Sequence, residues 1–272
     1  MNVFISVKDV EYGKVKWIDT RFNLQDAHKG KRQYEESHIT GAVYWDLEED
    51  LSDMTKLEGR HPMPGHAALT ELFRSSGLAI DDVIVVYDDG GSPFAARAWW
   101  LLQYAGFKNV TIALEGFDAI KDQGFPIDSI IPKPEPTAVT PQWDEAIYAS
   151  RQLVEETTSG QRSGCLLDAR SVERYRGEME PIDPIAGRIP GALNFDWEQL
   201  KKEGAYRMDD SVKSELRDVV DPAKEVTVYC GSGVTAAPLY AMLKQQGYEK
   251  VRLYVGSYSD WISDEKARIE KG

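Results

Sequence analysis

Short runs rich in apolar and β-branched residues alternate along the chain with longer segments whose apolar positions recur at helical spacing. Residues 83–87 and 226–229 form two such runs, and their composition is typical of strands buried in a parallel sheet. Residues 67–76 and 236–246 have the helical spacing, and Gly106 and Gly247 stand where helices end. The pattern therefore predicts an α/β fold with parallel sheets flanked by helices.

The pattern occurs twice, which indicates two copies of one structural unit. The matching segments are WIDTR (17–21) with LLDAR (166–170), HITGAVYWD (38–46) with RIPGALNFD (188–196), VIVVYD (83–88) with VTVYC (226–230), and VTIALEG (110–116) with VRLYVG (251–256). Residues 126–141, between the copies, contain five prolines and favour an extended connector. We predict domains at residues 1–125 and 142–272, joined by the linker 126–141.

The charge balance narrows the function. With 32 basic and 45 acidic residues, the net charge of −13 disfavours binding to nucleic acid or to an anionic membrane surface. No apolar run is long enough to span a membrane, and the first residues do not resemble a signal peptide, so we expect a cytoplasmic protein. Two cysteines and four histidines without metal-ligand spacing predict neither a disulfide framework nor a metal site.

One loop carries candidate chemistry. Cys230 ends a predicted strand, and the glycine-rich sequence GSGVT (231–235) leads into a predicted helix. Reactive sites of parallel sheets lie at this end of the strands, and a tight loop before a helix stabilises an anion such as a thiolate. We predict that Cys230 is a nucleophile, the alternative being a small buried core residue. Cys165 lacks this context and is predicted to be structural. Asp88 occupies the equivalent position in the first copy.

Two other interpretations of the loop have less support. Its glycines match the spacing of a dinucleotide fingerprint, but too little chain follows for a dinucleotide-binding half. A cysteine phosphatase needs an arginine six residues after the cysteine to bind phosphate, and that position is Ala236.

With its two copies, Asp88 in the first and Cys230 in the second, the whole chain resembles the tandem-domain rhodanese family of sulfurtransferases. Its CGSGVT loop is similar to that of 3-mercaptopyruvate sulfurtransferases, whereas thiosulfate enzymes carry basic residues where Gly231 and Ser232 stand. The resemblance implies two tandem rhodanese-like domains, each a parallel sheet flanked by helices, of which the second is catalytic.

The resemblance also implies a double displacement. Cys230 takes a sulfur atom from 3-mercaptopyruvate as a persulfide, and a small thiol, a thioredoxin-like protein or cyanide then removes it. It implies no metal or organic cofactor, and we expect a monomer. Three alternatives stay open: thiosulfate as donor, a sulfur carrier that serves one partner protein, and a degenerate, purely structural member.

The resemblance assigns substrate binding to the cysteine loop and to Arg174, which matches an arginine that binds the substrate carboxylate. The loop residues concerned are Gly231, Gly233, Val234 and Thr235. The family's second carboxylate arginine falls at about Asp183 and is absent here. Arg188 or Arg176 is the expected replacement.

A proton relay completes the expected site. Ser232 matches the serine of a Ser–His–Asp relay in 3-mercaptopyruvate sulfurtransferases, and Asp50 and His61 in the first copy match its acid and histidine. A departing enolate carbon needs a proton, which a polarised hydroxyl can deliver. The alternative is that His61 caps a loop and Asp50 lies on an acidic surface.

Overall fold

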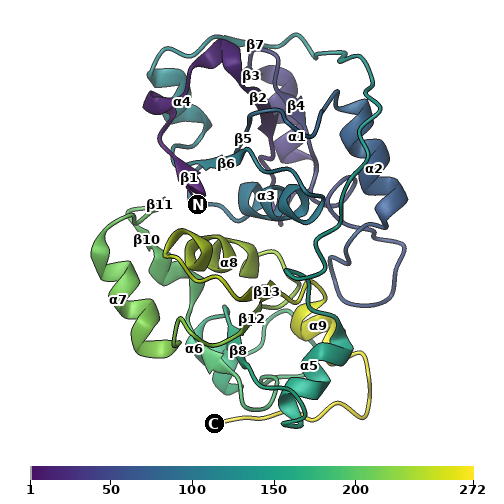
Figure 1. The fold of residues 1–272 in the computed structure, drawn as a ribbon, viewed down its shortest axis with the longest axis vertical. Helices are drawn as coiled ribbons and strands as arrows, with labels where there is room; N and C mark the ends of the chain where they lie inside the picture. Colours follow the sequence, from purple (N-terminus) through teal and green to yellow (C-terminus); the bar gives the residue numbers. More distant parts are fainter. Residues whose placement is uncertain (1) are drawn as a thin grey trace.

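The computed structural model describes residues 2–272 and contains two α/β units that lie one above the other along the long axis (Figure 1). We call residues 2–125 the first unit and residues 142–272 the second unit. The α/β architecture with parallel sheets, predicted from the sequence, is confirmed. Among the described residues, no helix has the length and apolar character needed to cross a membrane.

The first unit contains a parallel sheet of strand order β1-β6-β5-β2-β4. Its strands are β1 (Phe4–Ile5), β6 (Val110–Ala113), β5 (Ile84–Tyr87), β2 (Lys16–Asp19) and β4 (Val43–Tyr44). Its helices are α1 (Lys29–Glu36), α2 (His66–Ser75), α3 (Phe94–Tyr104) and α4 (Phe117–Asp122), with short 3-10 turns η1 (Val7–Asp9) and η2 (Tyr12–Lys14). Alternate residues of β5 face opposite cores: Ile84 and Val86 pack with α2 and α3, while Val85 and Tyr87 pack with α4.

The second unit repeats this arrangement with the strand order β13-β12-β8-β9, again all parallel. The strands are β13 (Val251–Leu253), β12 (Val226–Tyr229), β8 (Cys165–Asp168) and β9 (Leu193–Asn194). The helices are α5 (Arg151–Thr158), α6 (Val172–Arg176), α7 (Asp210–Val219), α8 (Ala236–Gln245) and α9 (Ser257–Trp261), with the 3-10 turn η3 (Trp197–Leu200). Helices α7 and α8 pack in the core that includes Val226 and Val228, whereas α5 and α9 pack in the core that includes Tyr229.

Two antiparallel pairs lie outside these sheets. Strand β7 (Ile127–Asp128) begins inside the predicted linker and pairs with β3 (His38–Ile39) of the first unit. The remainder of the linker, residues 129–141, contains no helix or strand and runs past α2, where Arg74 Nε donates to Val139 O at 3.0 Å. The second pair, β10 (Lys201–Lys202) with β11 (Ala205–Tyr206), forms a hairpin that reaches the first unit.

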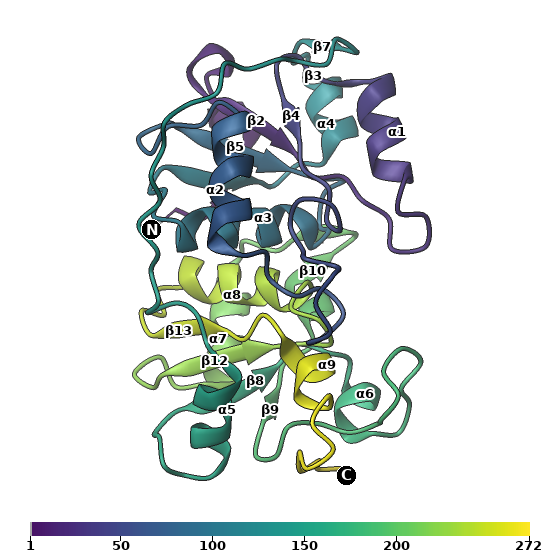
Figure 2. The ribbon, with the colours of Figure 1, turned by 90° about the vertical axis from the view of Figure 1, so that its right-hand side faces the viewer.

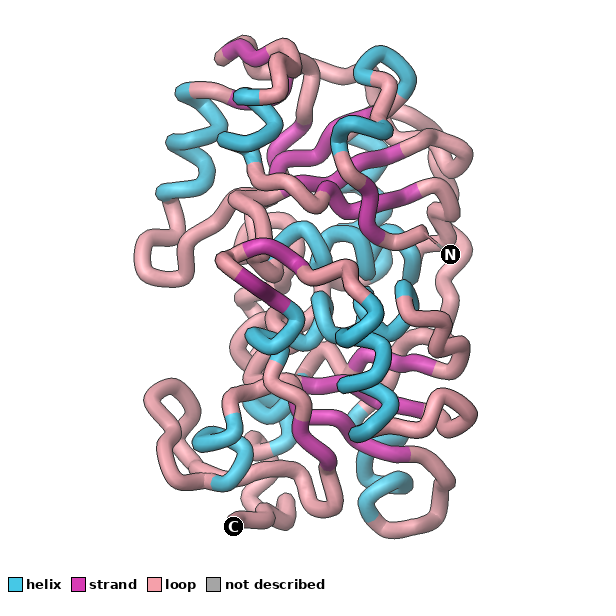
Figure 3. Tube along the Cα trace, turned by 90° about the vertical axis from the view of Figure 1, so that its left-hand side faces the viewer, coloured by secondary structure: helices cyan, strands magenta, loops and turns pink. Residues whose placement is uncertain are grey.

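Helices α3 and α8 form the contact between the units and lie between the two sheets (Figures 2 and 3). The rings of Trp99 and Trp100 on α3 lie 6.1 and 6.4 Å from the ring of Tyr240 on α8, and all three side chains are buried. The largest hydrophobic cluster therefore extends through both units. Because α3 and α8 each follow a strand-end loop, this contact brings the loops of the two units to the same interface.

Candidate active site

Cys230 lies directly after β12, in the loop that leads into α8. Its side chain is buried, and its Sγ accepts a hydrogen bond from Gly233 N at 3.1 Å. The neighbouring chain fixes its backbone, because Cys230 N donates to Ser257 Oγ at 3.1 Å and Tyr258 N donates to Cys230 O at 2.9 Å. The sulfur thus lies inside a tight turn at a helix N-terminus, an environment that stabilises a thiolate or persulfide anion.

The turn depends on Gly233, which has a φ of +76°. A Cβ at this position would also collide with the backbone oxygen of Val255. Gly231 has no such backbone requirement, and a Cβ there would collide only with the end of the Arg60 side chain among the described residues. Val234 is buried in the large hydrophobic cluster, and Thr235 is the N-cap residue of α8, although its side chain forms no capping hydrogen bond there.

Ser232 and His61 meet across the two units. Ser232 Oγ lies 2.9 Å from His61 Nδ1, and both side chains are buried. Burial, together with the charges of Arg97 and Arg60, lowers the pKa of His61 to about 4. The imidazole is therefore neutral at neutral pH, so it can accept the Ser232 proton or return one.

Asp50 does not join this pair. Its Oδ2 accepts from the backbone N of Asp46 at 2.8 Å, and no hydrogen bond or ion pair connects it with His61 in the described chain. The carboxylate beside His61 is instead Glu48, whose Oε1 lies 3.9 Å from His61 Nε2. Burial raises the pKa of Asp50 to about 6. The part of Asp50 in the expected relay therefore stays a prediction.

Arg174 lies at the site as expected, held by two acids. Its Nε donates to Glu180 at 3.0 Å, and its Nη2 donates to Asp183 Oδ2 at 2.9 Å. A second guanidinium, which the sequence did not indicate, binds the same aspartate: Arg60 Nε donates to Asp183 Oδ1 at 3.0 Å. Only its position directly before His61 could have drawn attention to Arg60.

The two expected replacements for the missing arginine point elsewhere. Arg188 binds the C-terminal segment, because its Nη1 donates to Gly272 O at 2.7 Å and its Nη2 pairs with Glu270. Arg176 is half exposed, and its nearest acid is Glu178 at 3.8 Å. Within the described residues, no hydrogen bond or ion pair connects either guanidinium with the Cys230 loop, so the expectation that one of them replaces the missing arginine stays a prediction that these contacts do not support.

Arg97 on α3 lies buried between the units beside this loop. Its Nη1 donates to Gly233 O at 3.4 Å, and its Nη2 donates to Leu51 O at 3.1 Å and to His61 O at 3.2 Å. No carboxylate lies within ion-pair distance of it in the described residues, and burial lowers its pKa to about 10. The side chain thus ties the cysteine loop to the loop that carries His61.

The equivalent loop of the first unit holds Asp88 instead of a thiol. Its two carboxylate oxygens accept hydrogen bonds from Gly90 N at 2.8 Å and Ala95 N at 3.0 Å. The N–H groups of this turn thus bind the side chain of Asp88, as Gly233 N binds the sulfur of Cys230 in the second unit. The β10–β11 hairpin covers this loop: Tyr206 Oη donates to Ser92 O at 2.7 Å, and Gly204 lies directly against Gly91. The loop of the first unit is thus covered by the hairpin.

The chain is similar to known proteins along nearly its whole length. The family model described as "Rhodanese-like domain" matches residues 7–123 and 150–264. The "Probable 3-mercaptopyruvate sulfurtransferase" of Pseudomonas aeruginosa is 38% identical over 261 residues, covering 94% of this chain and 92% of that protein. The "Putative thiosulfate sulfurtransferase SseB" of Mycobacterium tuberculosis is 38% identical over 265 residues, covering 95% and 91%. The solved 3-mercaptopyruvate sulfurtransferase SseA from Escherichia coli has a TM-score of 0.80 and 27% identity, covering 95% and 99%.

Proposed function

The chain belongs to the rhodanese family and is a sulfurtransferase, and from this premise we propose that it transfers sulfur from 3-mercaptopyruvate to a thiol or to cyanide through a persulfide on Cys230. The observation that carries the choice of donor is the hydrogen bond of 2.9 Å between Ser232 and a neutral His61 beside the nucleophile. This pair offers a proton to a carbon leaving group, which thiosulfate does not have. The cytoplasmic location and monomeric state stay predictions.

The first half-reaction forms a sulfur–sulfur bond. The Cys230 thiolate attacks the sulfur of 3-mercaptopyruvate, and the electron pair of the breaking carbon–sulfur bond remains on the carbon as an enolate. This carbon gains one proton to give pyruvate, and the substrate thiol loses one, so the persulfide forms as an anion. The Ser232–His61 pair is placed to pass this proton, and the Gly233 N–H that binds the sulfur can stabilise the persulfide.

The second half-reaction regenerates the enzyme. An acceptor thiolate, from a small thiol or a thioredoxin-like protein, attacks the outer sulfur, and the Cys230 thiolate leaves. Cyanide can act in the same way and gives thiocyanate. No step needs a metal or an organic cofactor, because each transfers a sulfur atom between nucleophiles.

Thiosulfate is the second candidate donor, and one observation favours it. Arg60 and Arg174 place two cations beside Gly231, although the loop itself carries no basic residue. Such a pair also suits the dianionic thiosulfate, from which Cys230 would take the outer sulfur and release sulfite. A relative named as a putative thiosulfate sulfurtransferase gives this candidate further support.

Steady-state sulfur transfer to cyanide tests the proposal, with 3-mercaptopyruvate and thiosulfate as parallel donors. We expect a much higher kcat/KM with 3-mercaptopyruvate, and no transfer by Cys230→Ser. A higher kcat/KM with thiosulfate would select the second candidate. Full activity of Cys230→Ser would exclude the persulfide mechanism, and slow transfer to every small acceptor but fast transfer to one protein would indicate a sulfur carrier.

A further inference from the structure

Two guanidinium groups from different units converge on the residue after the nucleophile. A Cβ built on Gly231 would collide with Arg60 Nη2 and would lie 3.2 Å from Arg174 Nη2. Arg60 belongs to the loop after β4 in the first unit, and Arg174 belongs to α6 in the second. Both groups therefore lie over the backbone of the loop that carries Cys230.

The carboxylate of Asp183 holds the two groups in place. Its side chain is 0% exposed, and a buried carboxylate is costly unless it is paired and hydrogen-bonded. Asp183 Oδ1 accepts from Arg60 Nε at 3.0 Å, and Oδ2 accepts from Arg60 Nη2 at 3.3 Å and Arg174 Nη2 at 2.9 Å. One buried acid thus orients two arginines at once.

Each arginine keeps one nitrogen for a ligand. Arg60 and Arg174 use Nε and Nη2 for their acids, and within residues 2–272 the Nη1 atom of either side chain forms no hydrogen bond and is reached by solvent. The side chains are 32% and 15% exposed. Arg188, in contrast, is 8% exposed and its Nη1 is occupied by Gly272 O.

We propose that Arg60 supplies, from the first unit, the second guanidinium that binds the carboxylate of the donor, together with Arg174, and that Asp183 is the positioning residue for both. This inference rests on the proposed function, because it concerns the donor that carries a carboxylate. Two guanidinium groups that bind one carboxylate form a charge-assisted, geometrically specific site. Asp183 stands where the resemblance implies an arginine, and it binds Arg60 of the first unit in place of that arginine. The donor then contacts both units.

The test compares KM for 3-mercaptopyruvate in the full-length enzyme and its Arg60→Gln variant. Loss of a charge-assisted contact to the substrate is expected to raise KM by about tenfold or more, with a smaller change in kcat. Arg60→Lys keeps the charge but not the planar fork, so its KM should lie between the two. Arg162→Gln is the matched control: Arg162 also pairs with an acid, Glu225 at 2.8 Å, and is 34% exposed, but it precedes β8, at the other end of the sheet.

Loading Cys230 with polysulfide, a donor without a carboxylate, separates substrate binding from damage to the loop. Because polysulfide is itself an anion, Arg60→Gln should slow persulfide formation only slightly, far less than it raises KM for 3-mercaptopyruvate, as measured by the mass increase of one sulfur atom. An unchanged KM in Arg60→Gln would overturn the inference, and so would an equal rise in Arg162→Gln. If the unsubstituted enzyme does not use 3-mercaptopyruvate, the proposed function itself is wrong, which is a different result.

Asp183→Asn tests the positioning role. Loss of the carboxylate should raise KM for 3-mercaptopyruvate, while polysulfide loading stays unchanged. Because both residues act on the same contact, the double variant Arg60→Gln with Asp183→Asn should show a smaller rise than the product of the two single rises. If the KM of the double variant rises by the full product of the two single rises, Asp183 acts independently of Arg60. If Asp183→Asn loses polysulfide loading, Asp183 only maintains the fold.

Discussion

At the residue scale, the Ser232–His61 pair should affect one donor and not the other. Ser232→Ala is expected to lower kcat with 3-mercaptopyruvate by about 100-fold, because proton transfer by a positioned group contributes at least that much. With thiosulfate, whose leaving group needs no proton on carbon, kcat should change little. Parallel steady-state assays with the two donors measure both effects.

His61→Gln provides the matched comparison. If the serine and histidine act as one unit, the double variant should be no slower than either single variant. Because burial lowers the pKa of His61 to about 4, its protonation should not appear in the kcat profile above about pH 5. An equal loss of activity with both donors would assign the pair a structural role instead.

Titration of Asp88 should make the free energy of unfolding depend on pH. Burial raises its pKa from 3.8 to about 7, so between these values the folded chain holds a proton that the unfolded chain has released. The stabilisation from this proton is present at low pH and is lost as the pH rises towards 7. Relative to Asp88→Asn, the protein should therefore lose about 3 kcal/mol of unfolding free energy between pH 5 and pH 8, as measured by denaturant unfolding at each pH.

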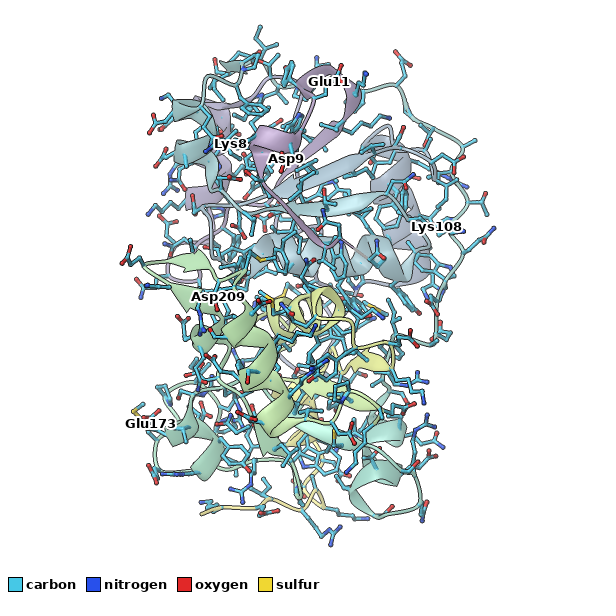
Figure 4. The ribbon with its side chains drawn as sticks, turned by 60° about the vertical axis from the view of Figure 1, so that its left-hand side comes forward. Lys8, Asp9, Glu11, Lys108, Glu173 and Asp209 are labelled. Atoms are coloured by element: carbon cyan, nitrogen blue, oxygen red, sulfur yellow. The ribbon has the colours of Figure 1, made fainter. Side chains whose placement is uncertain are left out.

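The control for this titration is Asp209 at the start of α7, which lies on the surface (Figure 4). Hydrogen bonds, the largest from Ser211, lower its pKa to about 2, so its contribution is complete above pH 4 and Asp209→Asn should not change the slope from pH 5 to pH 8. Any constant cost of the amide at position 88 shifts the whole curve and leaves the slope unaffected. If the unfolding free energies of Asp88→Asn and of the original protein change in parallel from pH 5 to pH 8, Asp88 is ionised throughout that range.

At the element scale, the internal repeat was enough to predict the sheets. The runs at 83–87 and 226–229 became β5 and β12, and the helical pattern at 236–246 became α8. Each of these elements is long enough for its strand or helix geometry to leave a periodic pattern in the sequence. The β10–β11 hairpin leaves none, because its two-residue strands are too short for a detectable alternation.

Gly233 should be the glycine on which the catalytic loop depends most. Gly233→Ala adds a Cβ to a residue at positive φ and against the Val255 oxygen, so the loop must open. We expect kcat/KM to fall by more than about 100-fold, since Sγ loses its Gly233 N–H, and the free energy of unfolding to fall by about 1–3 kcal/mol. Steady-state assays and denaturant unfolding measure the two effects.

The control for Gly233→Ala is a substitution at Gly247, which also has a positive φ but has open space where a Cβ would stand. Gly247→Ala should cost stability through backbone strain alone and leave kcat/KM unchanged. If both variants lose the same activity, general destabilisation explains the loss and the loop has no special role.

At the scale of the whole molecule, each unit covers the reactive end of the other. The loop with Arg60 and His61 lies over the Cys230 loop, and the β10–β11 hairpin lies over the Asp88 loop. The hydrophobic periodicity could not predict these contacts, because their partners are 123 and 171 residues apart. The resemblance to the family had matched His61 with Ser232, and the structure brings their side chains within 2.9 Å. The resemblance could not show which carboxylate of the acidic run 46–50 faces the imidazole, nor that Asp183 binds Arg60.

The shared interface predicts that the two units unfold together. One hydrophobic cluster extends through both, and the buried Arg97 joins the two loops, so separating the units would expose the Trp99–Tyr240 contact and leave carbonyl groups without their donor. Calorimetry should therefore show one transition whose calorimetric and van't Hoff enthalpies agree.

Tyr240→Ala tests the origin of this coupling, because Tyr240 is buried and contacts Trp99 and Trp100 of the other unit. Removing the ring should cost about 3 kcal/mol and make the van't Hoff enthalpy smaller than the calorimetric one as the units begin to unfold separately. Tyr248→Ala is the control, since Tyr248 is equally buried but its hydroxyl binds Val220 O within the second unit. It should lower the transition temperature and leave the enthalpies equal. Two transitions in the original protein would show instead that each unit is stable alone.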